Sequence, residues 1–115
     1  MAKISAYEDP KKSPYTLEYY DSSWEEEYMK ELENDDSVSK WTKNHGLRIK
    51  YFTTDNKFKT YVPDFLVEKT DGQIELVEMK GTHLLKNPNT LKKIEFAKKW
   101  CTTRGITYRI ISKYQ

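Results

Sequence analysis

Two short apolar runs that contain charged residues constrain this chain most. The first is Tyr61–Val67, with Asp64 after a proline, and the second is Leu76–Gly81, with Glu78 and Lys80. Short runs rich in valine, tyrosine and phenylalanine are typical of strands, whose side chains alternate between two faces. Glu78 and Lys80 therefore share a face, about 7 Å apart. Charges in such runs are costly unless they bind something. The pattern predicts a site for a divalent cation with oxygen ligands, Mg²⁺ or Mn²⁺.

The turn between the two runs decides whether the two acids share a face. A two-residue turn would pair Asp64 with Met79 and would place Asp64 on the face opposite to Glu78. A three-residue loop, Thr70–Gly72 with Gly72 in the left-handed conformation, pairs Asp64 with Glu78 instead. A cation site requires this second register, or a bulge with the same effect.

A Pro-Asp on one strand followed by Glu-x-Lys on the next resembles the signature of the PD-(D/E)XK nuclease superfamily. Pro63-Asp64 and Glu78-Met79-Lys80 match it position by position, and the resemblance runs from about residue 22 to the C-terminus. Within the superfamily the layout looks most like the TnsA-like endonuclease subunits of cut-and-paste transposition systems. Phage Holliday junction resolvases and type III restriction nuclease domains are its neighbours. The resemblance implies a restriction-endonuclease-like α/β core, a mixed sheet of about four strands flanked by helices in the order α-β-β-β-α-β.

The resemblance also implies roles for individual residues. Asp64 and Glu78 would ligate Mg²⁺ or Mn²⁺, and the backbone carbonyl of Met79 would complete the coordination. Lys80 would orient or activate the attacking water and steady the negative transition state. Related nucleases carry a glutamate on the first helix that points at the metal, and Glu25 is expected in that role. Hydrolysis of a phosphodiester would leave a 5′-phosphate and a 3′-hydroxyl.

Helical phasing selects Glu25 over its two acidic neighbours. A helix is expected from Ser22 or Ser23 to about Asn34. At about 100° per residue, Glu25 falls inside the apolar arc and its neighbours Glu26 and Glu27 face water. Ser22 lies three residues before Glu25, so a helix cap remains an alternative role for this glutamate. The apolar arc consists of Trp24, Tyr28, Met29 and Leu32.

The remaining pattern predicts a single domain preceded by an arm. Residues 1–20 show no clean period and are expected as an N-terminal arm pinned by tyrosines, whereas residues 21–115 form one nuclease domain. Val38 and Trp41 are expected in a connector, and the three tryptophans in the core. Further strands are expected at 47–54, 58–68, 73–80 and 106–112, and a second helix at 91–104, after a start signal at 87–90.

Charge is divided unevenly along the chain. Residues 1–40 hold 5 Lys against 11 Asp and Glu, whereas residues 41–115 hold 15 Lys and Arg against 7 Asp and Glu. The basic part as a whole suits nucleic acid as well as it suits an ordinary solvated surface, although any single lysine is better explained by the solvated surface. Candidate contacts to the DNA backbone are Lys50, Tyr51, Thr82, His83, Lys92, Lys98 and Lys99.

Composition excludes several classes of protein. Cys101 is the only cysteine, so an internal disulfide is impossible, and with only His45 and His83 a zinc site is disfavoured. No stretch approaches the roughly 20 apolar residues of a membrane span, and no secretory signal is visible. We therefore expect no membrane partner and a cytoplasmic location, in the host cell if the gene belongs to a phage.

The small size of the chain leaves the mode of targeting open. A domain of 115 residues has no room for a separate specificity module, so targeting is expected from homodimerisation or from a partner protein. A Holliday junction resolvase would be a symmetric dimer, whereas a transposition or restriction nuclease would be directed by its partner. A nuclease-fold protein that binds DNA or protein without cutting remains the alternative.

Overall fold

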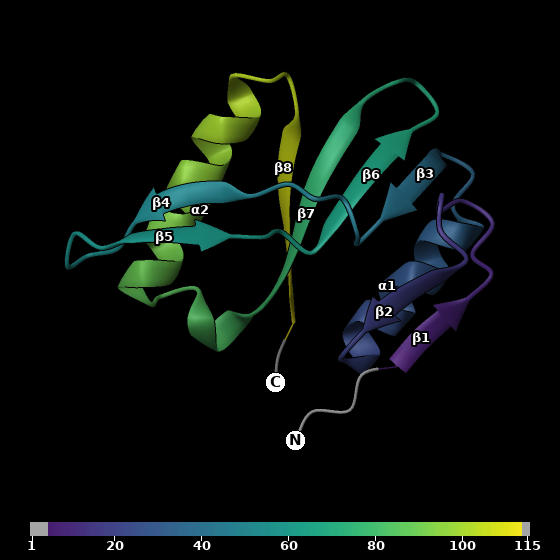
Figure 1. Ribbon diagram of the computed structural model, residues 1–115, viewed down its shortest axis with the longest axis horizontal. Coiled ribbons are helices and arrows are strands. Elements are labelled where there is room, and N and C mark those ends of the chain that lie inside the picture. Colours follow the sequence, from purple (N-terminus) through teal and green to yellow (C-terminus); the bar gives the residue numbers. More distant parts are fainter. Residues whose placement is uncertain (1–4, 114–115) are drawn as a thin grey trace.

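The computed structural model describes residues 5–113 of the chain. Within this range, short strands and two helices of three to four turns alternate in the order shown in Figure 1. The elements are β1 (Ser5–Glu8), β2 (Leu17–Tyr20), α1 (Ser23–Asn34), β3 (Val38–Thr42), β4 (Ile49–Phe52), β5 (Phe58–Tyr61), β6 (Phe65–Lys69), β7 (Ile74–Gly81), the 3₁₀ turn η1 (Thr82–Leu84), α2 (Pro88–Thr102) and β8 (Thr107–Lys113).

A four-stranded mixed sheet is the centre of the molecule. Its strand order is β3-β6-β7-β8, with antiparallel pairs except for the parallel pair β7 and β8. Figure 1 shows these strands side by side. The parallel pair is possible because α2 supplies the crossover between β7 and β8. This architecture confirms the expected mixed α/β sheet of four strands and is compatible with a restriction-endonuclease-like core.

The two helices pack on opposite faces of the sheet. Phe65 and Val77 point to one face, where they pack with Met29 of α1. Leu76, the neighbour of Val77, points to the other face and packs with Ala97 of α2. Side chains alternate along a strand, so each central strand contributes to both clusters. The sheet is therefore buried on both sides at its centre.

Both helices begin at the caps that the sequence indicates. The Ser22 hydroxyl accepts a hydrogen bond from the Glu25 backbone N–H, and the Asn87 side chain accepts from two backbone N–H groups at the start of α2. Pro88 fits the first turn because it needs no hydrogen-bond partner for nitrogen. Helix α2 therefore begins three residues earlier than expected, and it ends at Thr102.

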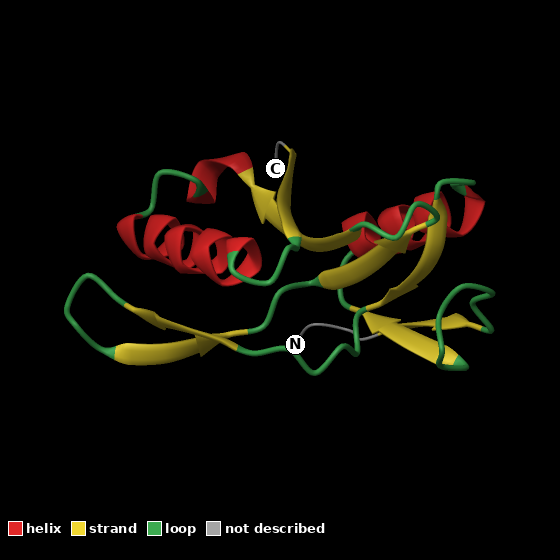
Figure 2. Ribbon diagram, turned by 90° about the horizontal axis from the view of Figure 1, so that it is seen from above, coloured by secondary structure: helices red, strands yellow, loops and turns green. Residues whose placement is uncertain are grey.

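The expected long strand at 58–68 is wrong, because the chain leaves one sheet and enters another in its middle. β5 ends at Tyr61, and β6 begins at Phe65. Pro63 lies in the gap and has no N–H to donate to a strand ladder. β5 instead pairs with β4 in a separate hairpin, which lies beneath α2 in Figure 2. The strand expected at 47–54 is thus β4, outside the central sheet.

The connector expected around Val38 and Trp41 is also wrong. These residues belong to β3, which pairs with β6 at the edge of the sheet. The register shifts between Val38 and Lys40, so the buried residues of β3 are three positions apart and no period of two is visible in the sequence. Trp41 is buried, as expected for a core tryptophan, but Trp24 and Trp100 are only half-buried.

The segment expected as an irregular arm contains a hairpin. β1 and β2 pair in antiparallel fashion, from Ser5 opposite Tyr20 to Glu8 opposite Leu17. Its connecting loop is fastened to α1, because the backbone N–H groups of Lys11 and Lys12 both donate to the Glu33 carboxylate. A tyrosine contributes as expected, since the Tyr20 hydroxyl lies 2.8 Å from Glu26 Oε2. The part of the expected arm at residues 1–4 lies outside the described residues.

Candidate active site

The loop between β6 and β7 adopts the register that the site requires. Gly72 has a φ of +89°, and the Lys69 N–H donates to the Gln73 carbonyl, so the loop has three residues. Phe65 lies opposite Val77, and the same register places Asp64 opposite Glu78 at the end of the ladder. The expected three-residue loop is confirmed.

The Asp64 side chain makes a hydrogen bond to β7 next to Pro63, which has no N–H to donate to the strand ladder. Its Oδ2 accepts a hydrogen bond of 2.8 Å from the Met79 backbone N–H. The Pro63 carbonyl accepts a hydrogen bond of 2.7 Å from His45 Nε2. The segment between β5 and β6 is therefore held in place by two hydrogen bonds, one at Pro63 and one at Asp64. The Asp64 carboxylate is fixed next to Glu78 by its position directly before β6 and by its hydrogen bond to β7.

Glu78 and Lys80 form a close pair on the face of β7 that carries α2. Lys80 Nζ lies 3.3 Å from Glu78 Oε2. Glu78 Oε1 is buried and has no hydrogen-bond partner. Burial, and secondly the negative charge of Asp64, raise the pKa of the Glu78 carboxyl to about 7, even though Lys80 acts in the opposite direction. A second cation at this position would therefore be strongly favoured.

Glu25 is buried on α1 and binds a lysine that the sequence analysis missed. Its Oε1 lies 2.7 Å from Lys43 Nζ and accepts a longer hydrogen bond from the Asp21 N–H. Burial raises the pKa of the Glu25 carboxyl, Lys43 lowers it, and the charge of Asp64 raises it again. Glu25 thus lies close enough to Asp64 to feel its charge. The capping alternative is also realised, since Ser22 caps the Glu25 N–H.

The burial of the three glutamates at the start of α1 agrees with the helical phasing that selected Glu25. Glu25 is buried, Glu26 is half-buried and Glu27 is exposed. However, within residues 5–113 no group of three His, Cys, Asp or Glu side chains is close enough to hold a metal ion. The structure brings Asp64, Glu78 and Lys80 together and leaves Glu25 at the margin of this group, bound to Lys43.

Lys93 of α2 is a further cation near the acidic pair. Its ammonium lies 5.2 Å from the centre of the Tyr61 ring. Burial, and secondly the charge of Lys80, lower the pKa of Lys93, while Glu78 and Asp64 oppose this change. Its position could have been found in the sequence, because it lies between Thr90 and Ala97 on the buried stripe of α2. No comparable signal pointed to Lys43.

The candidate DNA contacts fall on three separate elements. Thr82 and His83 belong to η1, directly after the Glu-x-Lys strand, and His83 is exposed. Lys92, Lys98 and Lys99 are on α2, where Lys99 pairs with Glu95 at 3.4 Å. Lys50 is exposed on β4, but Tyr51 is buried against α2, so its side chain does not present a surface for the expected contact with the DNA backbone.

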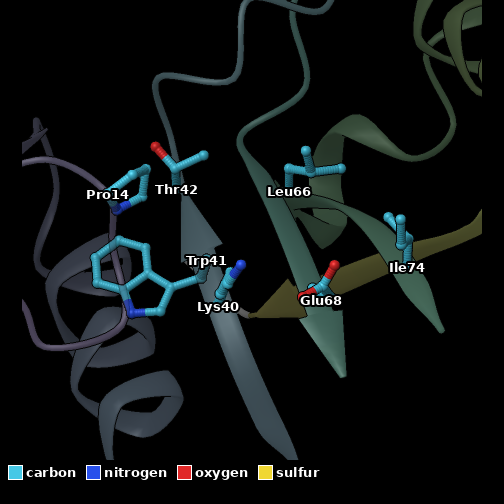
Figure 3. Close-up of a pocket in the computed structure, with 7 residues that line it drawn as sticks. All are labelled: Pro14, Lys40, Trp41, Thr42, Leu66, Glu68 and Ile74. Atoms are coloured by element: carbon cyan, nitrogen blue, oxygen red, sulfur yellow. The ribbon is translucent and has the colours of Figure 1, made fainter. Parts of the chain in front are cut away.

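A shallow apolar hollow lies on the central sheet, but it does not include the acidic pair. Figure 3 shows it between the β1–β2 loop and strands β3, β6 and β7. Its volume is about 190 Å³, and it is lined by Pro14, Lys40, Trp41, Thr42, Leu66, Glu68 and Ile74. Asp64, Glu78 and Lys80 do not line this hollow.

The comparisons with known proteins agree with the motif. A family model described as TnsA-like endonuclease N terminal matches residues 35–113, more than half of the 115-residue chain. The match includes Asp64, Glu78 and Lys80 but begins after α1, so Glu25 lies outside it. No curated protein matches the chain. Among residues 5–113, no helix is both long enough and apolar enough to cross a membrane.

Proposed function

The chain belongs to the TnsA-like endonuclease N-terminal family, a restriction-endonuclease-like family, and on this basis we propose that it is a metal-dependent DNA endonuclease. The proposal rests on the close approach of Asp64, Glu78 and Lys80, where the buried Glu78 Oε1 has no hydrogen-bond partner. A buried, unpaired carboxylate oxygen beside a second acid is costly unless a cation or a proton neutralises it.

The donor set fits a hard divalent cation. Asp64 and Glu78 supply carboxylate oxygens, and the group contains no sulfur or imidazole ligand, which favours Mg²⁺ or Mn²⁺ over zinc or copper. We propose Asp64 and Glu78 as ligands, with the Met79 carbonyl and Glu25 completing the set. When bound, such an ion lowers the pKa of water and neutralises charge that develops on a phosphoryl group.

The protein's own residues would position the reactants. Lys80 carries three donors on a half-buried ammonium held by Glu78, and it would orient the attacking water and offset negative charge in the transition state. Asp64 is held by the Met79 N–H, so its carboxylate needs little reorganisation. Lys93 adds positive charge on the α2 side, where the phosphate backbone would approach.

The proposal includes two possible modes of targeting. The family suggests a nuclease that works with DNA and a partner protein, whereas a resolvase would act as a homodimer. A cytoplasmic location follows from an activity on DNA. A nuclease-fold protein that binds without cutting is the second candidate. The ion pair between Glu25 and Lys43 favours it, because the Glu25 carboxylate is bound to a lysine and not directed at a metal site.

The test is an incubation with four substrates: supercoiled plasmid, linear duplex, single strand and a four-way junction. Each is offered with Mg²⁺, with Mn²⁺ and with EDTA, by the chain alone and together with candidate partners. Cleavage with metal and none with EDTA is expected. A protein that binds DNA but leaves all four substrates intact, with partners and Mn²⁺ present, would support the non-catalytic alternative.

Glu25 can be tested separately from the acidic pair. Glu25→Gln keeps an oxygen for the Asp21 N–H but loses the charge that a metal requires, so cleavage should fall at least about tenfold. Lys43→Gln breaks the same ion pair from the other side and leaves the carboxylate in place. Thermal melts and cleavage rates are compared for the two variants. Equal losses of stability and of cleavage would mean that Glu25 acts only through its pair with Lys43.

A further inference from the structure

The β4–β5 hairpin leaves two phenylalanines largely exposed, Phe52 and Phe58, although the Phe52 ring also lies 6.2 Å from the Phe96 ring of α2. Ile49 and Tyr51 of β4 face α2 and are buried, so the intervening residues face outward. Phe52 and Phe58 lie opposite each other in the ladder and remain 45% and 57% exposed. Their rings form an edge-to-face pair, 4.7 Å between centres.

Basic residues lie along the same hairpin. Lys50 Nζ lies 5.7 Å from the centre of the Phe58 ring. Residues 47–62 carry four cations and a single acid, Asp55, whose only described ion pair is the exposed contact with Lys57. The cations are Arg48, Lys50, Lys57 and Lys59, and all four are exposed. An apolar protein surface would offer Arg48, Lys50 and Lys59 no acidic partner, whereas a polyanion with flat apolar groups would satisfy both the cations and the phenylalanines.

The hairpin also leads directly into the candidate active site. β5 ends at Tyr61, and Asp64 follows three residues later. Phe58 and Asp64 are six positions apart in the chain, a separation of at most about 20 Å. One base pair of duplex DNA occupies about 3.4 Å along the axis, so the phenylalanine pair can reach DNA within about six base pairs of a phosphate bound at Asp64 and Glu78.

From these observations we infer that the outer face of the β4–β5 hairpin binds the DNA that flanks the cleaved phosphate. Phe52 and Phe58 stack against unpaired bases, and the cations of the hairpin contact phosphates. This inference rests on the proposed nuclease function. Aromatic side chains within a basic surface are the combination that holds nucleic acid bases without a strict sequence requirement. Figure 1 shows the hairpin projecting from one end of the molecule, where such a ligand has access.

The experiment measures binding of a labelled duplex of about 30 base pairs and of the matching single strand over a range of KCl concentrations. Ca²⁺ replaces Mg²⁺ to limit cleavage. The double variant Phe52→Ala/Phe58→Ala should bind the single strand at least about tenfold more weakly with an unchanged salt slope, since it removes stacking and no charge. Lys50→Gln should lower the salt slope by about one.

Two further variants keep the result interpretable. Tyr15→Ala/Leu17→Ala removes two exposed apolar side chains near β2, at the other end of the molecule in Figure 1, and should bind like the wild type. Phe58→Leu keeps apolar bulk on the hairpin and should preserve the thermal melt while still weakening binding. If both phenylalanine variants fold and bind DNA like the wild type, the inference is overturned. If the wild type itself neither binds nor cuts any substrate, the proposed function fails as well.

Discussion

Asp64→Asn and Lys80→Met should each lower the rate of metal-dependent cleavage by at least about a hundredfold while leaving the fold intact. Asparagine retains an oxygen that can accept the hydrogen bond from the Met79 N–H, so the register of β6 and β7 is preserved. It lacks the charge for a divalent cation. Methionine preserves the length and the apolar stem of Lys80 but removes its ammonium from the reacting phosphate.

Glu75→Gln is a matched control for these variants. Glu75 lies on the same strand as Glu78, and its Oε1 is likewise buried without a hydrogen-bond partner. It points to the opposite face of the sheet, where it lies 3.7 Å from Arg109. Single-turnover rates on plasmid and circular dichroism melts should show a normal rate for Glu75→Gln. Rates within a few-fold of wild type for Asp64→Asn would remove Asp64 from the site.

The grouping of Asp64, Glu78 and Lys80 was easier to predict than the sheet around it, and the reason lies in the range of the interactions. Asp64, Glu78 and Lys80 are related by one hairpin, so the loop length and the alternation of side chains decide their geometry. The break at Pro63 was visible as a missing donor, but the sequence does not show that β5 would leave the central sheet altogether. That outcome depends on α2, which packs on β4.

The residues missed by the sequence analysis differ in how they could have been found. Lys93 follows from the same phasing that selected Glu25, since it lies on the buried stripe of α2. Lys43 lies in an irregular segment after β3 and meets Glu25 only through the tertiary fold. β3 itself was hidden by the register shift at Val38 and Lys40. Long-range contacts of this kind leave no local pattern.

Glu78→Gln should abolish cleavage and yet stabilise the metal-free protein at pH 8. Burial and the charge of Asp64 raise the pKa of Glu78 to about 7 in the folded state, from an ordinary value of 4.5. Between these two values the folded state binds more protons than the unfolded state. The free energy of unfolding therefore falls as the pH rises through this window, by up to about 3 kcal/mol. Glutamine does not ionise, so the variant avoids this loss.

Thermal melts at pH 5 and pH 8, with EDTA and with Mg²⁺, separate the possible roles of Glu78. In EDTA, the wild type should be less stable than the variant at pH 8, and this difference should shrink at pH 5, where Glu78 is protonated in the folded protein. Mg²⁺ should stabilise the wild type at pH 8 and have little effect on the variant, because a ligand stabilises only the state that binds it. If Glu78 served instead as a structural partner of Lys80, the variant would be the less stable protein at pH 8 in EDTA. The sign of the stability difference between the wild type and Glu78→Gln at pH 8 in EDTA thus distinguishes a metal-binding carboxylate from one that stabilises the fold.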